Sequence, residues 1–268
     1  MEERSGQLIR VLFVGDIVGK SGRRVVEKLL PRIIGGQQVD LVVANAENAA
    51  GGVGLTPKVA EQLLNAGIDV LTSGNHIWKK KEIESYLDGT DRVLRPANYP
   101  PGAPGRGYCI VETAAGLPVA VLNLEGRVFM KPVDCPFRTA DLLIGGLQEE
   151  AAVLLVDFHA EATSEKLALA WYLDGRVSAV VGTHTHVQTA DERILPEGTG
   201  YITDVGMTGP TDSVLGVRKE DAIAQLISQR PTKFNLARAG QQLQAVLLDV
   251  ASASGRTESI TRICKAVE

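Results

Sequence analysis

All four histidines of the chain stand where predicted β-strands end. His184 and His186 share one loop directly after the apolar run 177–181, and His159 follows the apolar run 153–156. Binding sites are commonly built at the C-terminal edge of an α/β sheet, and imidazole is the commonest transition-metal ligand in proteins. These histidines are therefore candidate metal ligands.

Oxygen-bearing side chains follow three further apolar runs. They are Asp16 after 11–15, Glu47 and Asn48 after 41–44, and Asn75 after 70–74, where His76 also lies. Carboxylate, amide and imidazole ligands without cysteine suit Fe, Mn or Zn better than Ca or a closed thiolate zinc site. If Glu47 bridged two ions, the pair would activate a hydroxide and clamp the oxygens of an in-line phosphoryl displacement. The ligand types thus predict hydrolysis of a phosphoester.

The elements that must position these residues alternate between strands and helices. Strands are predicted at 9–15, 40–45, 68–73, 108–113, 118–124, 153–158, 177–182, 243–249 and 257–264, and helices at 21–34, 56–66, 163–173 and 219–229. Ser21 and Thr56 are candidate N-caps, and Pro57 suits a first helical position. Hairpin turns at 114–117 and 196–200 imply mixed parallel and antiparallel pairing. We therefore expect an α/β fold, a four-layer α-β-β-α sandwich of two mixed sheets, with residues 1–268 in a single domain.

Composition limits the classes of partner and the compartment. Of the 268 residues 44% are hydrophobic, enough for a substantial core, and the net charge of −4 argues against a long nucleic-acid surface. Cys109, Cys135 and Cys264 form no C-x-x-C pair, which favours a reducing compartment. Residues 1–5 lack the basic start of a secretory signal, and no segment is long enough to span a bilayer. We expect a cytoplasmic protein that does not enter membranes, and its length leaves a homo-oligomer open.

Five short blocks carry a family resemblance. They are Gly15-Asp16, Ala46-Glu47-Asn48, Ser73-Gly74-Asn75-His76, Phe158-His159-Ala160-Glu161 and Gly182-Thr183-His184-Thr185-His186. In order and strand-end context they resemble the signature blocks of the calcineurin-like metallophosphoesterases. Two departures stand out: no histidine follows two residues after Asp16, and Glu47-Asn48 replaces the usual Gly-Asp. This altered pattern resembles the YmdB-like branch, bacterial 2′,3′-cyclic-nucleotide 2′-phosphodiesterases.

The resemblance implies a role for each candidate residue. Glu47 would bridge two ions, most often iron, with Mn or Zn left open by ligand type. The first site would be completed by Asp16, Asn48 and His186, and the second by Asn75, His159 and His184. His76 would not be a ligand but would protonate the departing 2′ oxygen after the bridging hydroxide attacks phosphorus. The expected substrate is a small phosphodiester, specifically a 2′,3′-cyclic nucleotide.

Structural explanations compete with the metal assignments. A lone histidine such as His159 is more often a partly buried residue than a ligand. Asn75 could form a turn after Gly74, and Asn48 could cap the following segment. On an extended segment, His184 and His186 would point both rings to one face, since side chains repeat every second residue along a strand.

Neighbouring acidic residues have two interpretations. Asp157 and Asp204 could orient ligating imidazoles, or each could cap a strand end. Glu161 and Glu165 open a predicted helix, where carboxylates complement the dipole, so we expect them to be solvated.

Alternative functions use the same residues. A phosphomonoesterase or protein phosphatase would need the same metals, and a metal-holding regulatory or scaffold protein would need no chemistry. The presence of His76 beside a full ligand set favours an enzyme, because a scaffold needs no proton donor.

Overall fold

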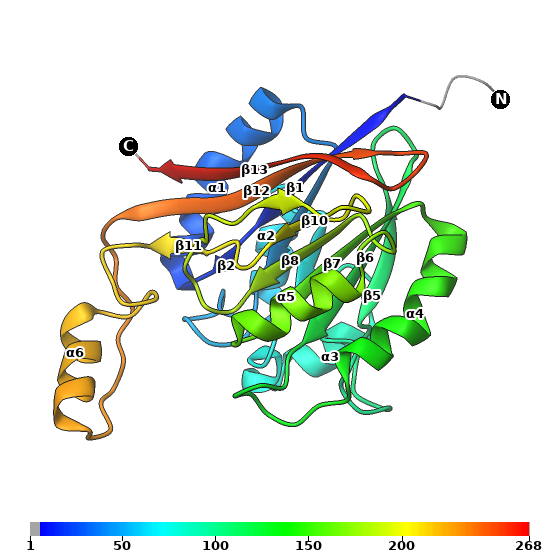
Figure 1. Ribbon diagram of the computed structural model, residues 1–268. Coiled ribbons are helices and arrows are strands. Elements are labelled where there is room, and N and C mark those ends of the chain that lie inside the picture. Colours follow the sequence, from blue (N-terminus) through cyan, green and yellow to red (C-terminus); the bar gives the residue numbers. More distant parts are fainter. Residues whose placement is uncertain (1–5, 268) are drawn as a thin grey trace.

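Two mixed β-sheets lie face to face between outer layers of helices in the computed structural model, which describes residues 6–267 (Figure 1). The strands are β1 (Leu8–Val14), β2 (Asp16–Ile17), β3 (Leu41–Asn45), β4 (Val70–Thr72), β5 (Tyr108–Glu112), β6 (Pro118–Glu125), β7 (Val153–His159), β8 (Ala179–Thr183), β9 (Arg193–Ile194), β10 (Gly200–Ile202), β11 (Met207–Pro210), β12 (Gln241–Ala251) and β13 (Thr257–Ala266). One sheet has the order β2-β11-β12-β1-β3-β4 with β13 beside β12, and the other has β5-β6-β7-β8-β10-β9.

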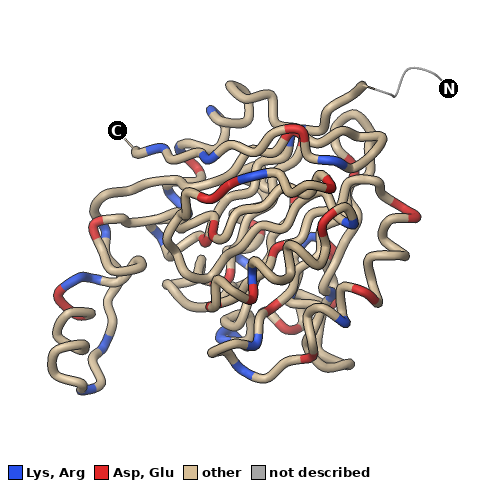
Figure 2. Tube along the Cα trace, viewed as in Figure 1, with Lys and Arg blue, Asp and Glu red and all other residues tan. Residues whose placement is uncertain are grey.

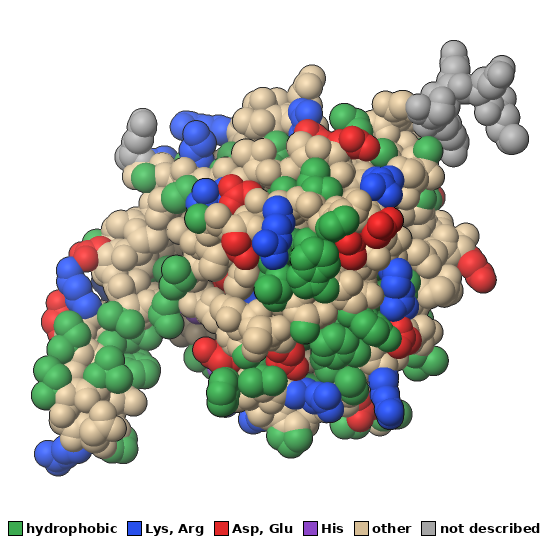
Figure 3. Space-filling view, in the orientation of Figure 1, with side chains coloured by type: hydrophobic (Ala, Val, Ile, Leu, Met, Phe, Trp, Pro, Cys, Tyr) green, Lys and Arg blue, Asp and Glu red, His purple; other side chains and the backbone are tan. Residues whose placement is uncertain are grey.

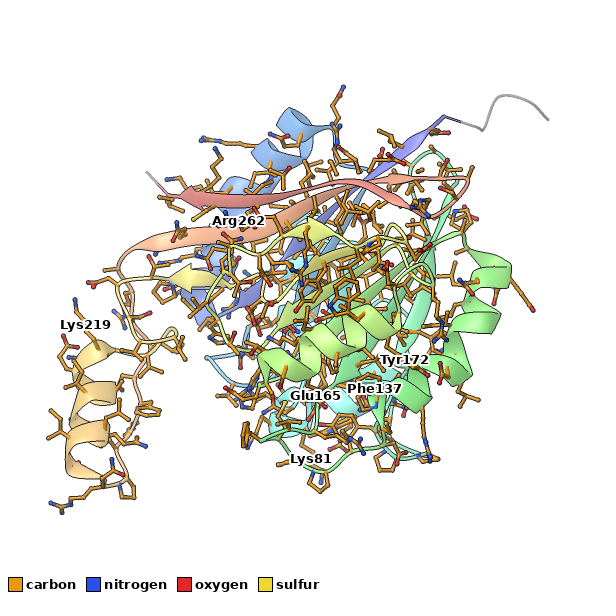
Figure 4. The ribbon with its side chains drawn as sticks, in the orientation of Figure 1. Lys81, Phe137, Glu165, Tyr172, Lys219 and Arg262 are labelled. Atoms are coloured by element: carbon orange, nitrogen blue, oxygen red, sulfur yellow. The ribbon has the colours of Figure 1, made fainter. Side chains whose placement is uncertain are left out.

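The helices fall into two groups, with α6 outside both. They are α1 (Gly19–Gln37), α2 (Pro57–Asn65), the 3-10 helix η1 (Ile77–Lys79), α3 (Ile83–Asp88), α4 (Pro136–Glu150), α5 (Thr163–Tyr172) and α6 (Lys219–Ser228). The first three α-helices pack on the outer face of the first sheet, and α4 and α5 pack on the second. Phe137 of α4 and Tyr172 of α5 point toward one another on this outer surface, with ring centroids 5.3 Å apart (Figure 4).

The period-two alternation of strand side chains separates three apolar layers. In β1, Val11 and Phe13 enter the layer between the sheets, whereas Leu12 and Val14 pack against the helices. The inter-sheet layer also receives alternate residues of β3, β6, β7 and β8. Each sheet therefore has two buried faces, which confirms the expected four-layer sandwich.

Two predictions of helix starts have different outcomes. Thr56 is the N-cap of α2, accepting from the Val59 N–H at 3.3 Å, as predicted. The prediction that Ser21 is the N-cap of α1 was wrong, because α1 already begins at Gly19. The N-cap is Val18, whose carbonyl accepts from the Gly22 N–H. The sequence prediction also lacked α4, although Pro136 at its first position is a typical start signal.

Parallel pairing brings the functional strand ends together. β1, β3 and β4 run parallel in one sheet, and β6, β7, β8 and β10 run parallel in the other. The carboxyl ends of the parallel strands in each sheet therefore lie at one edge.

Positions of both charge signs are interspersed along the chain (Figure 2), and most of these residues are exposed or half-buried. Within residues 6–267, the charged residues that are completely buried are Asp16, Glu47, Glu125, Asp157, Lys166 and Asp204. Every one except Lys166 lies within two residues of a strand end. Because charged side chains are rarely buried without partners, we expect partners for these side chains at the strand ends.

The segment around α6 stands apart from the sandwich (Figure 1). Hydrophobic side chains are visible on the surface of this segment (Figure 3). Leu226 and Ile227 of α6 are 69% and 80% exposed. Among the described helices, none combines the length and apolar character needed to cross a bilayer. The segment Met1–Ser5, on which the expectation of no secretory signal depends, lies outside the described residues.

Candidate metal centre

The seven predicted ligands and His76 lie in one continuous network of contacts at the edge where the strands end. Asp16, Asn48 and His186 form one part of it. Asn48 Nδ2 lies 3.2 Å from His186 Nε2, which in turn lies 3.7 Å from Asp16 Oδ1. This Asp16 oxygen is buried and has no hydrogen-bond partner among the described residues. A buried carboxylate oxygen left in this way fits a cation between it and the imidazole.

Asn75, His159 and His184 form the second part. His159 Nε2 lies 3.1 Å from Asn75 Oδ1 and 3.0 Å from His184 Nδ1. One ring nitrogen carries either one proton or one lone pair, so it cannot satisfy both neighbours and a carboxylate as well. Ligand atoms of Glu47, His159 and His184 all lie within 4.8 Å of one another, close enough to hold one ion.

Glu47 belongs to both parts. Its Oε1 accepts from Asn48 Nδ2 at 3.0 Å and lies 3.3 Å from His159 Nε2. Its Oε2 accepts from the His76 N–H at 2.9 Å. Glu47 follows the end of β3 at Asn45. Asn45 and Glu47 both contact His159 of the other sheet, whereas Ala46 between them packs in the layer against the helices. A single buried carboxylate thus contacts two separate groups of ligand atoms.

His76 lies beside this carboxylate, at the start of η1. Its Nδ1 is 2.8 Å from Asn48 Oδ1 and 3.0 Å from Glu47 Oε1. The side chain is 29% exposed, in contrast to the buried Glu47. With Nδ1 engaged, Nε2 is the nitrogen left for a bound molecule.

The loop that carries His184 and His186 is not extended. β8 ends at Thr183, and the two histidines have φ angles of 100° and 63°. Such left-handed conformations are unusual for residues other than glycine and cost energy unless surrounding contacts hold them. The prediction that both rings share one face was therefore wrong, because His184 contacts His159 and His186 contacts Asn48.

A buried ion pair holds the middle of this loop. Lys166 Nζ lies 2.7 Å from Asp204 Oδ2, and both side chains are completely buried. The same oxygen accepts from the backbone N–H and the hydroxyl of Thr185, at 3.0 and 2.7 Å. Asp16 Oδ2 accepts from the His184 N–H at 3.2 Å. Of the two interpretations of Asp204, the structure favours orientation of the histidine loop.

Charges of opposite sign are coupled across the site. Burial opposes ionisation of Glu47, but His159 and His76 more than offset it and hold the pKa of that carboxyl well below its ordinary value. Burial would likewise lower the pKa of His159, but the Glu47 carboxylate raises it to about 9. Burial and the nearby His159 lower the pKa of His184. The ionised Glu47 carboxylate and the neutral His184 imidazole are both forms that bind a cation.

Comparison with known proteins identifies the family. The family model for YmdB-like proteins matches residues 12–263, nearly the whole chain. The chain belongs to the YmdB-like family. It is 48% identical to the 2′,3′-cyclic-nucleotide 2′-phosphodiesterase of Bacillus subtilis (strain 168), over 95% of this chain and 96% of that protein.

Two solved structures share the architecture of this YmdB-like chain. A hypothetical protein from Thermus thermophilus is 44% identical with a TM-score of 0.91, covering 97% of this chain and 100% of the other. A phosphatase from Mycoplasma pneumoniae is 35% identical with the same TM-score, covering 97% and 94%. These relatives confirm the α/β fold and show that the chain is a phosphoric ester hydrolase.

One buried carboxylate of this YmdB-like chain, Glu125, was not among the residues predicted from the sequence. Glu125 ends β6 beside His159 of β7, and neither of its carboxylate oxygens has a hydrogen-bond partner among the described residues. Burial raises the pKa of Glu125 to about 7. A sequence pattern could have identified Glu125 as a candidate, because Asn123-x-Glu125 follows an apolar run with the same spacing as Asn45-x-Glu47.

The two acidic residues near α5 have different outcomes, since Glu161 is exposed as expected and Glu165 is not. Glu165 is buried rather than solvated, and its carboxylate accepts from the N–H groups of Arg127 and Val128 at 3.0 and 3.1 Å (Figure 4). Glu161 precedes α5 and lies 2.9 Å from His184 Nε2 through its Oε2. Glu165 therefore holds the backbone of the loop at Arg127 and Val128, and Glu161 contacts the ring of the candidate ligand His184. In the sequence, both carboxylates are typical of a helix start.

Proposed function

We propose that this chain hydrolyses 2′,3′-cyclic nucleotides with the help of two transition-metal ions. The observation that carries the proposal is the division of the candidate ligands into two groups that share Glu47, with His76 beside the shared carboxylate. The name of the Bacillus subtilis relative supports this class of substrate.

The ligand set fits two ions. Glu47 would be shared, one ion would be held by Asp16, Asn48 and His186, and the other by Asn75, His159 and His184. The unpartnered oxygen of Asp16 and the crowded Nε2 of His159 are the features that a cation would satisfy. Mixed oxygen and nitrogen ligands favour iron, with manganese and zinc as alternatives. When bound, such ions supply Lewis-acid charge and an activated water for displacement at phosphorus.

His76 is the proposed general acid. Asn48 and Glu47 hold its Nδ1, which orients the ring and leaves Nε2 to face the substrate. Proton transfer from Nε2 to the 2′ oxygen would complete opening of the ring and leave a 3′-phosphate. The partial exposure of this side chain allows contact with a nucleotide, and imidazole is the side chain most often used for general acid catalysis.

The proposed compartment is the cytoplasm. Cys109, Cys135 and Cys264 are all free thiols, one buried, one partly buried and one exposed. Unpaired thiols of this kind are typical of proteins in a reducing compartment.

The test combines elemental analysis with a panel of substrates: 2′,3′-cyclic nucleotides, 3′,5′-cyclic nucleotides, linear diesters and monoesters. We expect preferential hydrolysis of 2′,3′-cyclic nucleotides, with the 3′-phosphate as product by phosphorus NMR. A phosphomonoesterase is the second candidate, because a similar solved structure is described as a phosphatase. Activity confined to monoesters would establish it instead, and inactivity of the fully metallated protein would favour a regulatory or scaffold role.

Two histidine variants separate acid from ligand. His76→Ala should lower turnover by about 10²- to 10⁴-fold, the usual contribution of general acid catalysis, while bound metal remains. His159→Ala should lose metal and turnover together. Full turnover by His76→Ala would remove the role proposed for this residue.

A further inference from the structure

A layer of buried polar side chains lies directly beneath the candidate ligands. Asp157, two residues before His159 on β7, points to the same side of the strand. Its Oδ2 accepts from the Thr72 hydroxyl at 2.5 Å and from Asn45 Nδ2 at 3.1 Å. Its Oδ1 accepts from the Thr183 hydroxyl at 2.8 Å. All of these side chains are completely buried, so water cannot replace any of these donors.

Thr183 links this carboxylate to His159. The two residues are paired in register across β7 and β8, and Thr183 Oγ1 lies 2.8 Å from His159 Nδ1. A hydroxyl carries one proton, and Asp157 Oδ1 takes it. Asn45 Nδ2 also lies 3.3 Å from His159 Nδ1, but its two hydrogens have other acceptors, Asp157 Oδ2 at 3.1 Å and the Ser73 carbonyl at 3.3 Å. Thr183 Oγ1 therefore presents a lone pair to His159 Nδ1, which must be the nitrogen that carries hydrogen.

The opposite arrangement is unfavourable. If Thr183 donated to His159 Nδ1 instead, the hydroxyl would turn a lone pair toward Asp157 Oδ1. That oxygen would then be buried without a donor, since its partner in the structure is Thr183.

We propose that Asp157, acting through Thr183, is a positioning residue that selects the Nδ1–H tautomer of His159 and so directs the lone pair of Nε2 into the metal centre. The inference rests on the proposed function, because it assumes that Nε2 is a ligand atom. It extends that proposal to two residues that touch neither a metal nor a substrate. Partners of this kind fix the tautomer and orientation of ligating imidazoles in other metal sites.

Thr183 offers a matched pair of variants. Thr183→Val keeps the shape and removes the hydroxyl, whereas Thr183→Ser keeps the hydroxyl and removes a methyl group. With zinc alone as the probe, competition against a chromophoric chelator measures affinity. We expect about 10- to 100-fold weaker zinc binding for Thr183→Val, the usual effect of losing such a partner, and near wild-type affinity for Thr183→Ser.

Asp157→Asn tests the direction of the hydrogen bonds that join Asp157, Thr183 and His159, and it changes the side-chain volume very little. Its amide can donate to Thr183 Oγ1, which frees the hydroxyl proton for His159 Nδ1 and favours hydrogen on Nε2. We expect zinc affinity to fall as in Thr183→Val. Nitrogen-15 NMR of histidine in the zinc-loaded wild type should show His159 protonated at Nδ1 and bound through Nε2.

Three results would overturn the proposal: wild-type zinc affinity in Thr183→Val, an equal loss in Thr183→Ser, or His159 bound to zinc through Nδ1. Circular dichroism checks that each variant folds, and Asp157→Asn supplies the comparison if Thr183→Val does not. None of these measurements uses a nucleotide. The role of Asp157 and Thr183 can therefore be tested even if the protein does not hydrolyse cyclic nucleotides.

Discussion

Gly74 lies against the ring of His159, and its replacement by alanine tests whether that ring position matters. A Cβ built at Gly74 would lie 2.1 Å from Cδ2 and 2.3 Å from Nε2 of His159. Optimal carbon contacts are about 3.5 to 4.0 Å, so the ring would have to retreat by more than about 1 Å. His159 is completely buried, and the displacement would move Nε2 away from Asn75 and Glu47.

The expected magnitude follows from this displacement. A misplacement of about 1 Å in an active site can cost about 100-fold in rate, and overpacking costs typically about 1 to 3 kcal/mol of stability. We therefore expect Gly74→Ala to fold, to bind metal more weakly, and to lose about 100-fold in kcat/KM.

Gly146→Ala is the matched control. Gly146 lies within α4, and a Cβ there meets no atom within 4 Å. This variant should keep full activity and gain about 0.5 to 1 kcal/mol, because alanine favours the helix. Urea unfolding, metal titration and cyclic-nucleotide hydrolysis are measured on both variants. If Gly74→Ala matched the wild type in metal affinity and rate, the observed position of His159 would not be the one that functions.

Two further predictions concern buried charges. Lys166→Met leaves the Asp204 carboxylate buried without its cation, so the free energy of unfolding in urea should fall by about 3 to 5 kcal/mol. Lys219→Met, which breaks an exposed pair, should change it little. Burial raises the pKa of Glu125 from 4.5 to about 7, so the folded state binds a proton that the unfolded state releases. The metal-free protein should therefore lose stability, by up to about 3 kcal/mol, as pH rises from 4.5 through 7, and Glu125→Gln should remove this dependence in thermal unfolding with a chelator present. A slope unchanged in Glu125→Gln would assign the effect to another group.

Much of this arrangement was readable from local patterns in the chain. Apolar runs of strand length, each followed by an acidic, amide or imidazole side chain, determine which residues reach the sheet edge, because parallel strands end together. The alternation of strand side chains then determines that Asp157 and His159 of β7 point the same way. Helix signals such as Thr56-Pro57 are equally local, and the structure bears this one out.

Tertiary structure decided how those residues divide and what holds them. Asp16 and His184 are separated by 168 positions in the chain, and their hydrogen bond exists only because the two sheets pack face to face. The left-handed turns that send His184 and His186 to different groups depend on hydrogen bonds from outside their own segment. The burial of Lys166 depends on Asp204 in the same way, since an unpaired ammonium would not leave water. Short-range sequence patterns therefore determine which faces of an element are apolar and where its strands end. Packing between distant segments determines which side chains become the partners of buried charges.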